Sequence, residues 1–293
     1  MNQNYIIATA STADLTKDYL DRHNIPFIGY TYVMNDELFY DDCKEESKQE
    51  FYAKMREGML PSTSAINTYT YKEFFEGLLQ TGRDVVFMDM SFEMSSSHRF
   101  CDEAIEQLKE EYPDRKIVNV DTRCISGGLG MLVEGAVDLY EQGKTMDEVL
   151  QWIEENKYTI AHRFTVDDLK WLKRGGRVSN AAALVGALLS IKPVMYVPNE
   201  GTLVVSEKVR GRKKALNAIV EAIQNDVKDP DGKVFRILHA DCREDAEYVR
   251  DRLKELYPTA GEITITGLGV VIGAHCGPGL FTIFYRTEGR TEK

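Results

Sequence analysis

Short apolar runs alternate with amphipathic segments through the first half of the chain. Residues 5–8, 84–90 and 117–121 are apolar runs with the length of buried strands, and the segments between them carry apolar positions at helical spacing. Strands that alternate with helices in this way are typical of a parallel sheet with helices on its faces. We therefore expect residues 1–157 to form an α/β domain built on a parallel sheet.

From residue 158 the pattern changes to closely spaced strands. The turn Asn199-Glu200-Gly201 separates two of them as a hairpin, which requires a sheet that is at least partly antiparallel. A chain of 293 residues also exceeds the length that one core ordinarily serves. We expect residues 158–293 to form a second, α+β domain with a mostly antiparallel sheet. Its expected strands are 159–164, 194–197, 203–206, 234–240, 262–266, 270–274 and 279–285, and its expected helices are 213–225 and 244–257.

Capping patterns predict where several helices begin. Ser11 directly follows the first strand and is expected to open a helix, because hydroxyl groups satisfy the free N–H groups of a first turn. Thr70 with Glu73, and Thr145 with Glu148, have the spacing of capping boxes. Because the first of these boxes starts its helix at Thr70, we expect Ser62, Thr63 and Ser64 to lie in the polar loop before it.

Hydroxyl side chains gather where strands of the first domain end. Ser11 follows one strand, Ser95 lies in a serine-rich turn after another, and the polar loop at 61–67 contains Thr63 and Ser64. Ligands of parallel sheets bind beside the carboxyl ends of the strands. Hydroxyl residues also favour caps and loops for structural reasons alone. For each single residue both interpretations stay open, and three such segments at one edge favour a ligand site.

A Gly-Gly-Arg turn opens the most distinctive stretch of the second domain. Gly175 and Gly176 allow a tight turn, and Arg177 follows them with a planar, anion-binding head group. The spacing alone leaves open a helix cap followed by a solvated arginine. Residues 181–191 are apolar nearly all round, which predicts a buried helix that ends at Lys192-Pro193. Its small residues fit either ordinary packing or an elongated apolar ligand.

Charge and composition exclude several classes of protein. A formal net charge of −11 argues against a general binder of nucleic acid or of anionic membranes. The N-terminus lacks a signal-peptide pattern, and the longest apolar run is too short to span a bilayer. Five cysteines without a Cys-x-x-Cys pair fit a reducing compartment. We expect a cytoplasmic protein with no integral membrane association.

Cofactor and metal signatures are missing from the sequence. The glycines at 127–130 do not have the spacing of a dinucleotide-binding loop, and the histidines are not spaced as metal ligands. We therefore expect no cofactor and no metal. His275 precedes the turn Cys276-Gly277-Pro278-Gly279, and the strand expected there places His275 and Cys276 on opposite faces. His275 is then either a buried structural histidine or part of a site.

Several of these motifs, in this order and at these separations, resemble the DegV family. They are Leu172-Lys173-Arg174-Gly175-Gly176-Arg177-Val178-Ser179, Ile191-Lys192-Pro193, Lys208-Val209-Arg210-Gly211 and Ala274-His275-Cys276-Gly277-Pro278-Gly279. The resemblance covers essentially the whole chain. It implies a bacterial fatty-acid-binding protein, which in some members is the lipid-presenting subunit of fatty acid kinase.

The resemblance also implies which residues surround the lipid carboxylate. By position these are Thr63, Ser64, Ser95, Arg177 and His275. Hydroxyl donors and an arginine suit a carboxylate because their hydrogen bonds are charge-assisted. The acyl tail is expected in an apolar tunnel beside the 181–191 helix, with the ligand between the two domains.

The basic cluster that starts at Arg210 has two interpretations. Arg210 is expected to contact phosphate or an acidic partner, the catalytic subunit of the kinase, while a solvated helix start is the structural alternative. The segments Thr9-Ala10-Ser11 and Ala65-Ile66-Asn67 depart from the family pattern, which has an aspartate at the first and Gln-Pro-Ser at the second.

The expected function is that of a non-catalytic carrier. It binds a long-chain fatty acid and presents the carboxylate to a separate ATP-dependent kinase. The alternative is a serine esterase or acyl transferase that uses a loop serine and His275, but the sequence has no Gly-x-Ser-x-Gly elbow and no identifiable orienting acid. A regulatory lipid sensor is a third interpretation, which only an assay with a kinase separates from a carrier.

Overall fold

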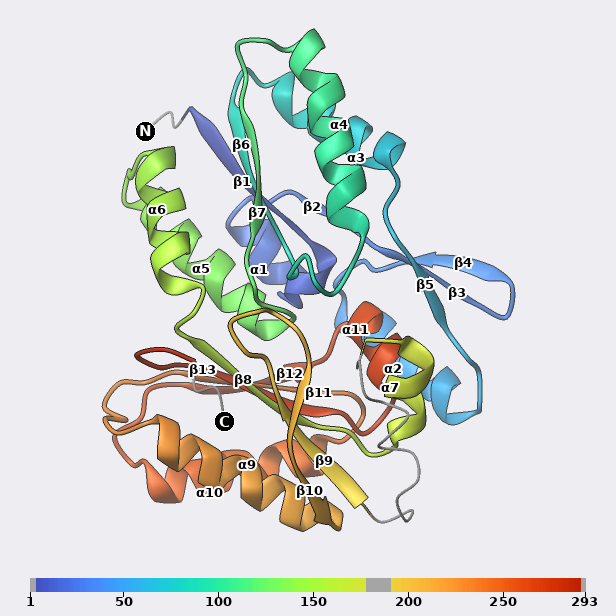
Figure 1. Ribbon diagram of the computed structural model, residues 1–293, viewed down its shortest axis with the longest axis vertical. Helices are drawn as coiled ribbons and strands as arrows, with labels where there is room; N and C mark the ends of the chain where they lie inside the picture. Colours follow the sequence, from blue (N-terminus) through green and yellow to red (C-terminus); the bar gives the residue numbers. More distant parts are fainter. Residues whose placement is uncertain (1–3, 178–190, 291–293) are drawn as a thin grey trace. The chain divides into compact units, whose positions relative to one another are not determined.

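The computed structural model describes residues 4–177 and 191–290 (Figure 1). The chain divides into two compact units. Unit 1 comprises Met1–Lys44 and Ser62–Lys157, and unit 2 comprises Glu45–Pro61 and Tyr158–Lys293.

Helix α2 (Glu45–Arg56) belongs to unit 2, which corrects the expected division of the chain into residues 1–157 and 158–293. The Lys48 ammonium donates to the carbonyl oxygen of Gly267 (3.0 Å), and the Tyr52 hydroxyl donates to that of Leu268 (3.0 Å). These bonds join positions 219 and 216 residues apart. A local sequence pattern gives no sign of contacts at such separations. The expected domain boundary therefore assigned α2 to the wrong unit.

Unit 1 is built on a four-stranded parallel sheet, as the alternating pattern predicted. The strand order is β2-β1-β6-β7, and every neighbouring pair is parallel. All six residues of β1 are buried, because helices cover both faces of the sheet. The strands are β1 (Tyr5–Ala10), β2 (Phe27–Ile28), β6 (Asp84–Asp89) and β7 (Ile117–Asp121).

The helices of unit 1 lie on both faces of this sheet, α3 and α4 on one face and α5 and α6 on the other (Figure 1). The capping box predicted for Thr145 and Glu148 is confirmed: it starts α6, with both reciprocal hydrogen bonds present. The helices are α1 (Lys17–Arg22), α3 (Thr68–Leu79), α4 (Ser97–Glu111), α5 (Gly127–Glu141) and α6 (Met146–Asn156).

Two predictions of helix starts in unit 1 were wrong. Ser11 opens only the short 3-10 helix η1 (Ser11–Ala13), and α1 begins later with Thr16 as its cap. Asn67 caps α3 in place of Thr70: its side-chain oxygen accepts from the Thr70 N–H (2.9 Å). Asparagine is at least as good a cap as threonine, so the earlier polar residue starts the helix.

A second, three-stranded antiparallel sheet in unit 1 was not predicted. It has the order β4-β3-β5, from β4 (Glu37–Tyr40), β3 (Thr31–Met34) and β5 (Ser62–Ser64). The segment expected as a polar loop therefore contains a strand. Ser62–Ser64 pairs with residues 31–33, and this long-range pairing outweighs the weak strand propensity of serine.

Unit 2 contains a mixed, mostly antiparallel sheet of six strands, as predicted. The order is β10-β9-β8-β13-β11-β12, and only the last pair, β11 with β12, is parallel. Gly201 donates to the carbonyl oxygen of Pro198 (3.0 Å) in the predicted turn between β9 and β10. The strands are β8 (Ile160–Thr165), β9 (Ile191–Tyr196), β10 (Val204–Arg210), β11 (Phe235–His239), β12 (Ile263–Gly267) and β13 (Phe281–Arg286).

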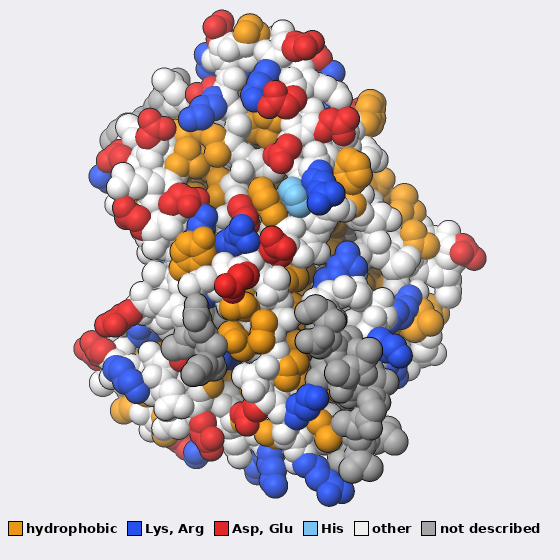
Figure 2. Space-filling view, in the orientation of Figure 1, with side chains coloured by type: hydrophobic (Ala, Val, Ile, Leu, Met, Phe, Trp, Pro, Cys, Tyr) orange, Lys and Arg blue, Asp and Glu red, His pale blue; other side chains and the backbone are white. Residues whose placement is uncertain are grey.

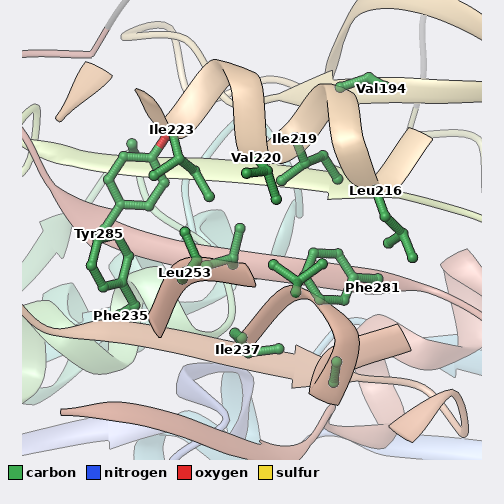
Figure 3. Close-up of a cluster of buried hydrophobic side chains, with 14 of the residues drawn as sticks. Val194, Leu216, Ile219, Val220, Ile223, Phe235, Ile237, Leu253, Phe281 and Tyr285 are labelled. Atoms are coloured by element: carbon green, nitrogen blue, oxygen red, sulfur yellow. The ribbon is translucent and has the colours of Figure 1, made fainter. Parts of the chain in front are cut away.

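The core of unit 2 lies between this sheet and helices α9 (Arg212–Asp226) and α10 (Arg243–Leu256). Figure 3 shows Ile219 and Ile223 of α9 facing the sheet residues Phe235 and Phe281, with Leu253 of α10 beside them. All five side chains are fully buried. Each such side chain contributes about 1.5–3 kcal/mol relative to an exposed position, so this cluster holds α9 and α10 on the sheet.

The segment expected as a strand at 270–274 is instead helix α11 (Val270–Cys276). It packs on α7 (Leu169–Gly175), and its small residues allow close neighbours: a Cβ at Gly273 would collide with the Tyr52 ring. Tertiary packing here overrides the β-propensity of the two valines and the isoleucine. Adjacent positions on this helix still point in different directions.

Part of one prediction lies outside the described residues. The buried helix expected at 181–191, and the tail tunnel beside it, fall there except for Ile191. The expected stop Lys192-Pro193 is wrong in one respect, since both residues lie within β9. Pro193 pairs only with β10, because the pairing of β8 with β9 begins at Val194. A residue without an N–H is tolerated where one side of the strand has no partner.

Candidate functional site

The predicted site residues occupy two places, hydroxyl groups in unit 1 and an Arg–His pair in unit 2. In unit 1, Ser95 lies in the turn between β6 and α4 and is half-buried. The Ser95 hydroxyl donates to the Ser97 oxygen (3.1 Å), and the Ser97 N–H donates back to the Ser95 oxygen (3.1 Å). The Ile66 N–H also donates to the Ser97 oxygen (3.1 Å). The serine turn and the segment after β5 are therefore brought together through Ser97.

Thr63 and Ser64 lie on β5 at the edge of the three-stranded sheet. Thr63 is half-buried opposite Tyr32, and Ser64 is exposed opposite Thr31. Successive side chains of a strand leave it on opposite faces. The Ser64 hydroxyl has no polar partner among the described residues, so it is available to a ligand.

Beneath the serine turn lies a buried polar cluster that sequence reasoning missed. Its centre is Asp89, the last residue of β6, whose side chain accepts hydrogen bonds from Thr12 (2.6 Å), Tyr30 (2.8 Å), Tyr71 (3.4 Å) and the Met90 N–H (2.7 Å). Burial raises the pKa of Asp89 above its usual range and that of Tyr30 well above it. The one available sequence signal was an acidic residue inside the apolar run at 84–90.

Ser11, another hydroxyl at this sheet edge, has a structural role. It is buried, and its oxygen accepts the Tyr30 N–H (3.2 Å). The Tyr30 hydroxyl in turn donates to Asp89, so this tyrosine links η1 to the end of β6.

In unit 2, the Gly-Gly-Arg turn caps the C-terminus of helix α7 and carries an exposed arginine. Gly176 caps α7 in the left-handed conformation (φ 67°), and its N–H donates to the Leu172 carbonyl oxygen (3.1 Å). A glycine suits this position because a Cβ disfavours positive φ. Arg177 follows, exposed, and donates to the Gly175 carbonyl oxygen (2.6 Å).

His275 lies directly against this turn. A Cβ at Gly175 would stand 2.9 Å from the His275 Nδ1 atom, so only glycine permits the approach. Burial, and next the positive charge of Arg177, lower the pKa of His275 from 6.5 to about 4. The structure thus brings Arg177 and His275 together and keeps the imidazole uncharged at neutral pH.

This pair has the chemistry of an anion site. The Arg177 guanidinium offers N–H donors and a positive charge. The single N–H of the neutral His275 imidazole is used by the backbone of Gly175, so this ring offers a further donor only when it is protonated. An anion beside the pair offsets the repulsion between Arg177 and a protonated His275.

Arg210, the residue expected to contact phosphate or a partner, ends β10 and is exposed. Its side chain has no polar partner among the described residues. The neighbouring Arg212 is instead paired with Asp245 (2.8 Å), and the Lys213 ammonium lies over the Tyr248 ring (5.2 Å). Arg210 therefore keeps its charge available, whereas Arg212 holds α9 to α10.

Further features of the described residues concern the surface charge, the expected lack of membrane association and the esterase alternative. Figure 2 shows acidic and basic side chains interspersed over the visible face. Within residues 4–177 and 191–290, no helix has the length and apolar composition needed to cross a membrane. Within unit 1 the Ser95 hydroxyl donates to the Ser97 oxygen, and the His98 ring contacts the Ser95 carbonyl oxygen (2.7 Å) rather than the hydroxyl.

Comparison of sequences places these features in a known group. A family model described as "Uncharacterised protein, DegV family" matches residues 5–288. A DegV domain-containing protein of Clostridium perfringens is 38% identical over 96% of this chain and 97% of its own length. Another, YteA of Lactococcus lactis, is 32% identical over 95% and 96%.

Solved structures with the same fold have been described as fatty-acid-binding proteins. A DegV family protein from Thermus thermophilus, whose structure is described as showing fatty acid binding, superposes with a TM-score of 0.87 at 27% identity, covering 97% of this chain and 100% of its own. DegV of Bacillus subtilis, described as a fatty acid binding protein, superposes with a TM-score of 0.84 at 27% identity, covering 98% and 100%.

Proposed function

The chain belongs to the DegV family, and from this premise we propose that it binds a long-chain fatty acid by its carboxylate. The observation that carries the proposal is the Arg177–His275 pair at the Gly175 turn, an exposed cation beside an uncharged imidazole. The likeness to fatty-acid-binding structures over nearly the whole chain supports it. In the proposed complex Arg177 and His275 bind the carboxylate, together with Thr63, Ser64 and Ser95.

The acyl tail supplies most of the affinity in this proposal and occupies an apolar tunnel. Each buried methylene contributes about 0.8 kcal/mol, so a long chain offers on the order of 10 kcal/mol before ordering costs. A single charge-assisted hydrogen bond contributes only about 1.5–3 kcal/mol. Affinity should therefore rise with chain length, while the head-group residues fix the position of the carboxylate.

Replacement of Arg177 tests the head-group assignment. The Arg177→Ala variant should bind a long-chain fatty acid about 10- to 100-fold more weakly, because it removes one charge-assisted interaction. Titration calorimetry of the full chain measures this. Lys173→Ala is the matched control: Lys173 is exposed on α7, has no polar partner among the described residues and should not affect binding. Equal affinity of the wild type and Arg177→Ala, with both folded, would contradict the assignment.

We further propose that the protein is a carrier and not a catalyst, and that a separate ATP-dependent fatty acid kinase phosphorylates the bound carboxylate. Arg210 supports this finer proposal, as an exposed cation without a protein partner in the described ranges. With purified kinase and ATP, Arg210→Ala should slow acyl phosphate formation about tenfold, since it removes a charge that attracts phosphate or an acidic surface. Fatty acid binding should stay unchanged. Lys228→Ala is the control, because it removes another exposed cation, which follows α9. Equal rates with the wild type, Arg210→Ala and Lys228→Ala would reject the role of Arg210.

A further inference from the structure

A cavity of about 480 Å³ lies within unit 1, beside strand β1. Its floor is formed by Ile6 and Ile7, near the start of the strand. Leu78 of α3 and Val137 of α5 line it from the helices on the two faces of the sheet. Ser95, by contrast, follows the end of β6, which runs parallel to β1. The cavity and the serine turn therefore lie at opposite ends of the sheet.

The cavity occupies the space that a longer β2 would fill. The two strands pair at only two positions, the last two residues of β1. The Thr9 N–H donates to the Pro26 carbonyl oxygen (3.1 Å), so this side of β1 faces β2. The next hydrogen bond toward the start of β1 would join the N–H of residue 26 to the Ile7 carbonyl oxygen. Proline has no N–H, so the pairing ends there.

The backbone of Ile7 consequently presents a donor and an acceptor to the cavity. Peptide groups two positions apart along a strand point to the same side, so the Ile7 N–H and C=O point in the direction of the Thr9 N–H. Neither group makes a hydrogen bond on that side within residues 4–177 and 191–290. Ile7 is only 5% exposed. Peptide groups this buried need hydrogen-bond partners, and here the partner must come from within the cavity.

Two arginines line the same cavity and have no acidic partner among the described residues. Arg22, the last residue of α1, is exposed and makes no polar contact there. The Arg83 Nε–H donates to the Thr81 hydroxyl (3.1 Å), which leaves the two terminal nitrogens of this guanidinium free. Two cations that line one cavity repel each other, and a bound anion offsets that repulsion.

The acidic residue of the lining, Glu141, is already bound. Its Oε1 atom lies 2.6 Å from the His23 Nδ1 atom, and the His23 ring lies against the Tyr19 ring with centroids 4.3 Å apart. This contact joins the residue after α1 to the last residue of α5. Two arginines against one glutamate leave the lining positive, in a chain whose formal net charge is −11.

We propose that this cavity is a second ligand site, which binds an adenine mononucleotide. Arg22 and Arg83 bind the phosphate, because a phosphate ester carries about two negative charges. Adenine has an amino donor beside a ring-nitrogen acceptor. The amino group donates to the Ile7 carbonyl oxygen, and the ring nitrogen accepts the Ile7 N–H. The volume of the cavity lies in the range of small-molecule sites. The inference does not rest on the proposed function, because the two sites share no residue.

Titration calorimetry of the full chain with AMP tests the site. We expect one AMP per chain, bound at least about tenfold more tightly than inorganic phosphate or adenosine, since each of these reaches one half of the site. Arg22→Ala and Arg83→Ala should each weaken AMP binding about tenfold. Arg99→Ala is the matched control, because Arg99 is an exposed arginine of α4 without a polar partner in the described part of the chain. Arg177→Ala should bind AMP as the wild type does.

Inosine monophosphate tests the contact with the backbone. It has the size and the phosphate of AMP but exchanges donor and acceptor on the ring, so it should bind at least about tenfold more weakly. In two-dimensional 1H–15N spectra of the wild type, AMP should shift the Ile7 amide signal.

Four results would overturn the inference. They are no binding of AMP, equal binding of AMP and inosine monophosphate, AMP binding unchanged in both Arg22→Ala and Arg83→Ala, and an Ile7 amide signal that stays in place at saturating AMP. The last measurement uses the wild type alone, so it decides the question even if a variant does not fold. Failure of the wild type to bind oleate would overturn the proposed function and leave this inference standing.

Discussion

His275 is uncharged at neutral pH because burial and the neighbouring Arg177 both disfavour its protonated form. The Gly175 turn can therefore hold an arginine and a histidine side by side without repulsion between two cations. This arrangement lowers the unfolding free energy only at acidic pH. There the unfolded chain takes up a proton that the folded chain does not.

The pH dependence of stability follows from this difference. The pKa of His275 is about 4 in the folded chain and near 6.5 when unfolded. Below pH 6.5 the unfolded state binds more protons, so the unfolding free energy falls as pH decreases from 6.5 to 4. Stability is unaffected by this group above pH 6.5, and the loss below it reaches on the order of 3 kcal/mol.

Denaturant unfolding of the wild type and of His275→Gln between pH 4 and 7.5 measures this contribution. The variant removes the titrating group but keeps a side-chain N–H, so the stability difference between the two proteins should shrink or reverse at low pH. Parallel stability curves over the whole range would show that the folded-state pKa of His275 is not lowered.

At the residue scale the two parts of the candidate site leave different signals in the sequence. Arg177 and His275 belong to compact motifs with glycines beside them, and the structure brings the two together. The Asp89–Tyr30 contact joins positions 59 residues apart, and neither residue belongs to a recognisable motif. Buried polar contacts of this kind depend on tertiary packing and leave no local pattern.

At the scale of elements, helix packing in unit 1 depends on close approach at one glycine. A Cβ at Gly135 of α5 would collide with the Trp152 ring of α6, whereas Gly77 of α3 has open space around the same position. Both glycines lie inside helices. They differ in their neighbours, so the same substitution should have opposite effects at the two positions.

Gly135→Ala should lower the unfolding free energy by about 1–3 kcal/mol, because the tryptophan must shift to admit a methyl group. Gly77→Ala should raise it by about 0.5–1 kcal/mol, because alanine restricts the unfolded chain and favours the helix. Denaturant unfolding of both variants checks the pair. A stabilising Gly135→Ala would mean that α5 and α6 are not packed closely at this position.

The elements that sequence analysis predicted correctly are those with a local signal. Strands β1, β6 and β7 of the parallel sheet and the cap of α6 follow from apolar runs and from capping residues. The failures are β5, whose pairing with β3 is remote in sequence, and α11, whose β-branched residues favour a strand. In both cases contacts with distant segments decide the conformation.

At the scale of the whole molecule, two units with different sheets provide different chemistry. Unit 1 supplies hydroxyl groups beside a buried carboxylate, and unit 2 supplies a cation beside a neutral imidazole. The sequence predicted two domains of these classes, but the transfer of α2 to unit 2 depends on contacts that no local pattern encodes.

Native mass spectrometry of the protein purified from cells tests the central claim most directly. We predict one long-chain fatty acid bound per chain, or stoichiometric binding of added fatty acid to emptied protein. Denaturing spectra of the same sample should show the mass of the bare chain, because the lipid is not covalently attached. A correctly folded protein that carries no fatty acid and takes up none at saturating concentration would contradict the account.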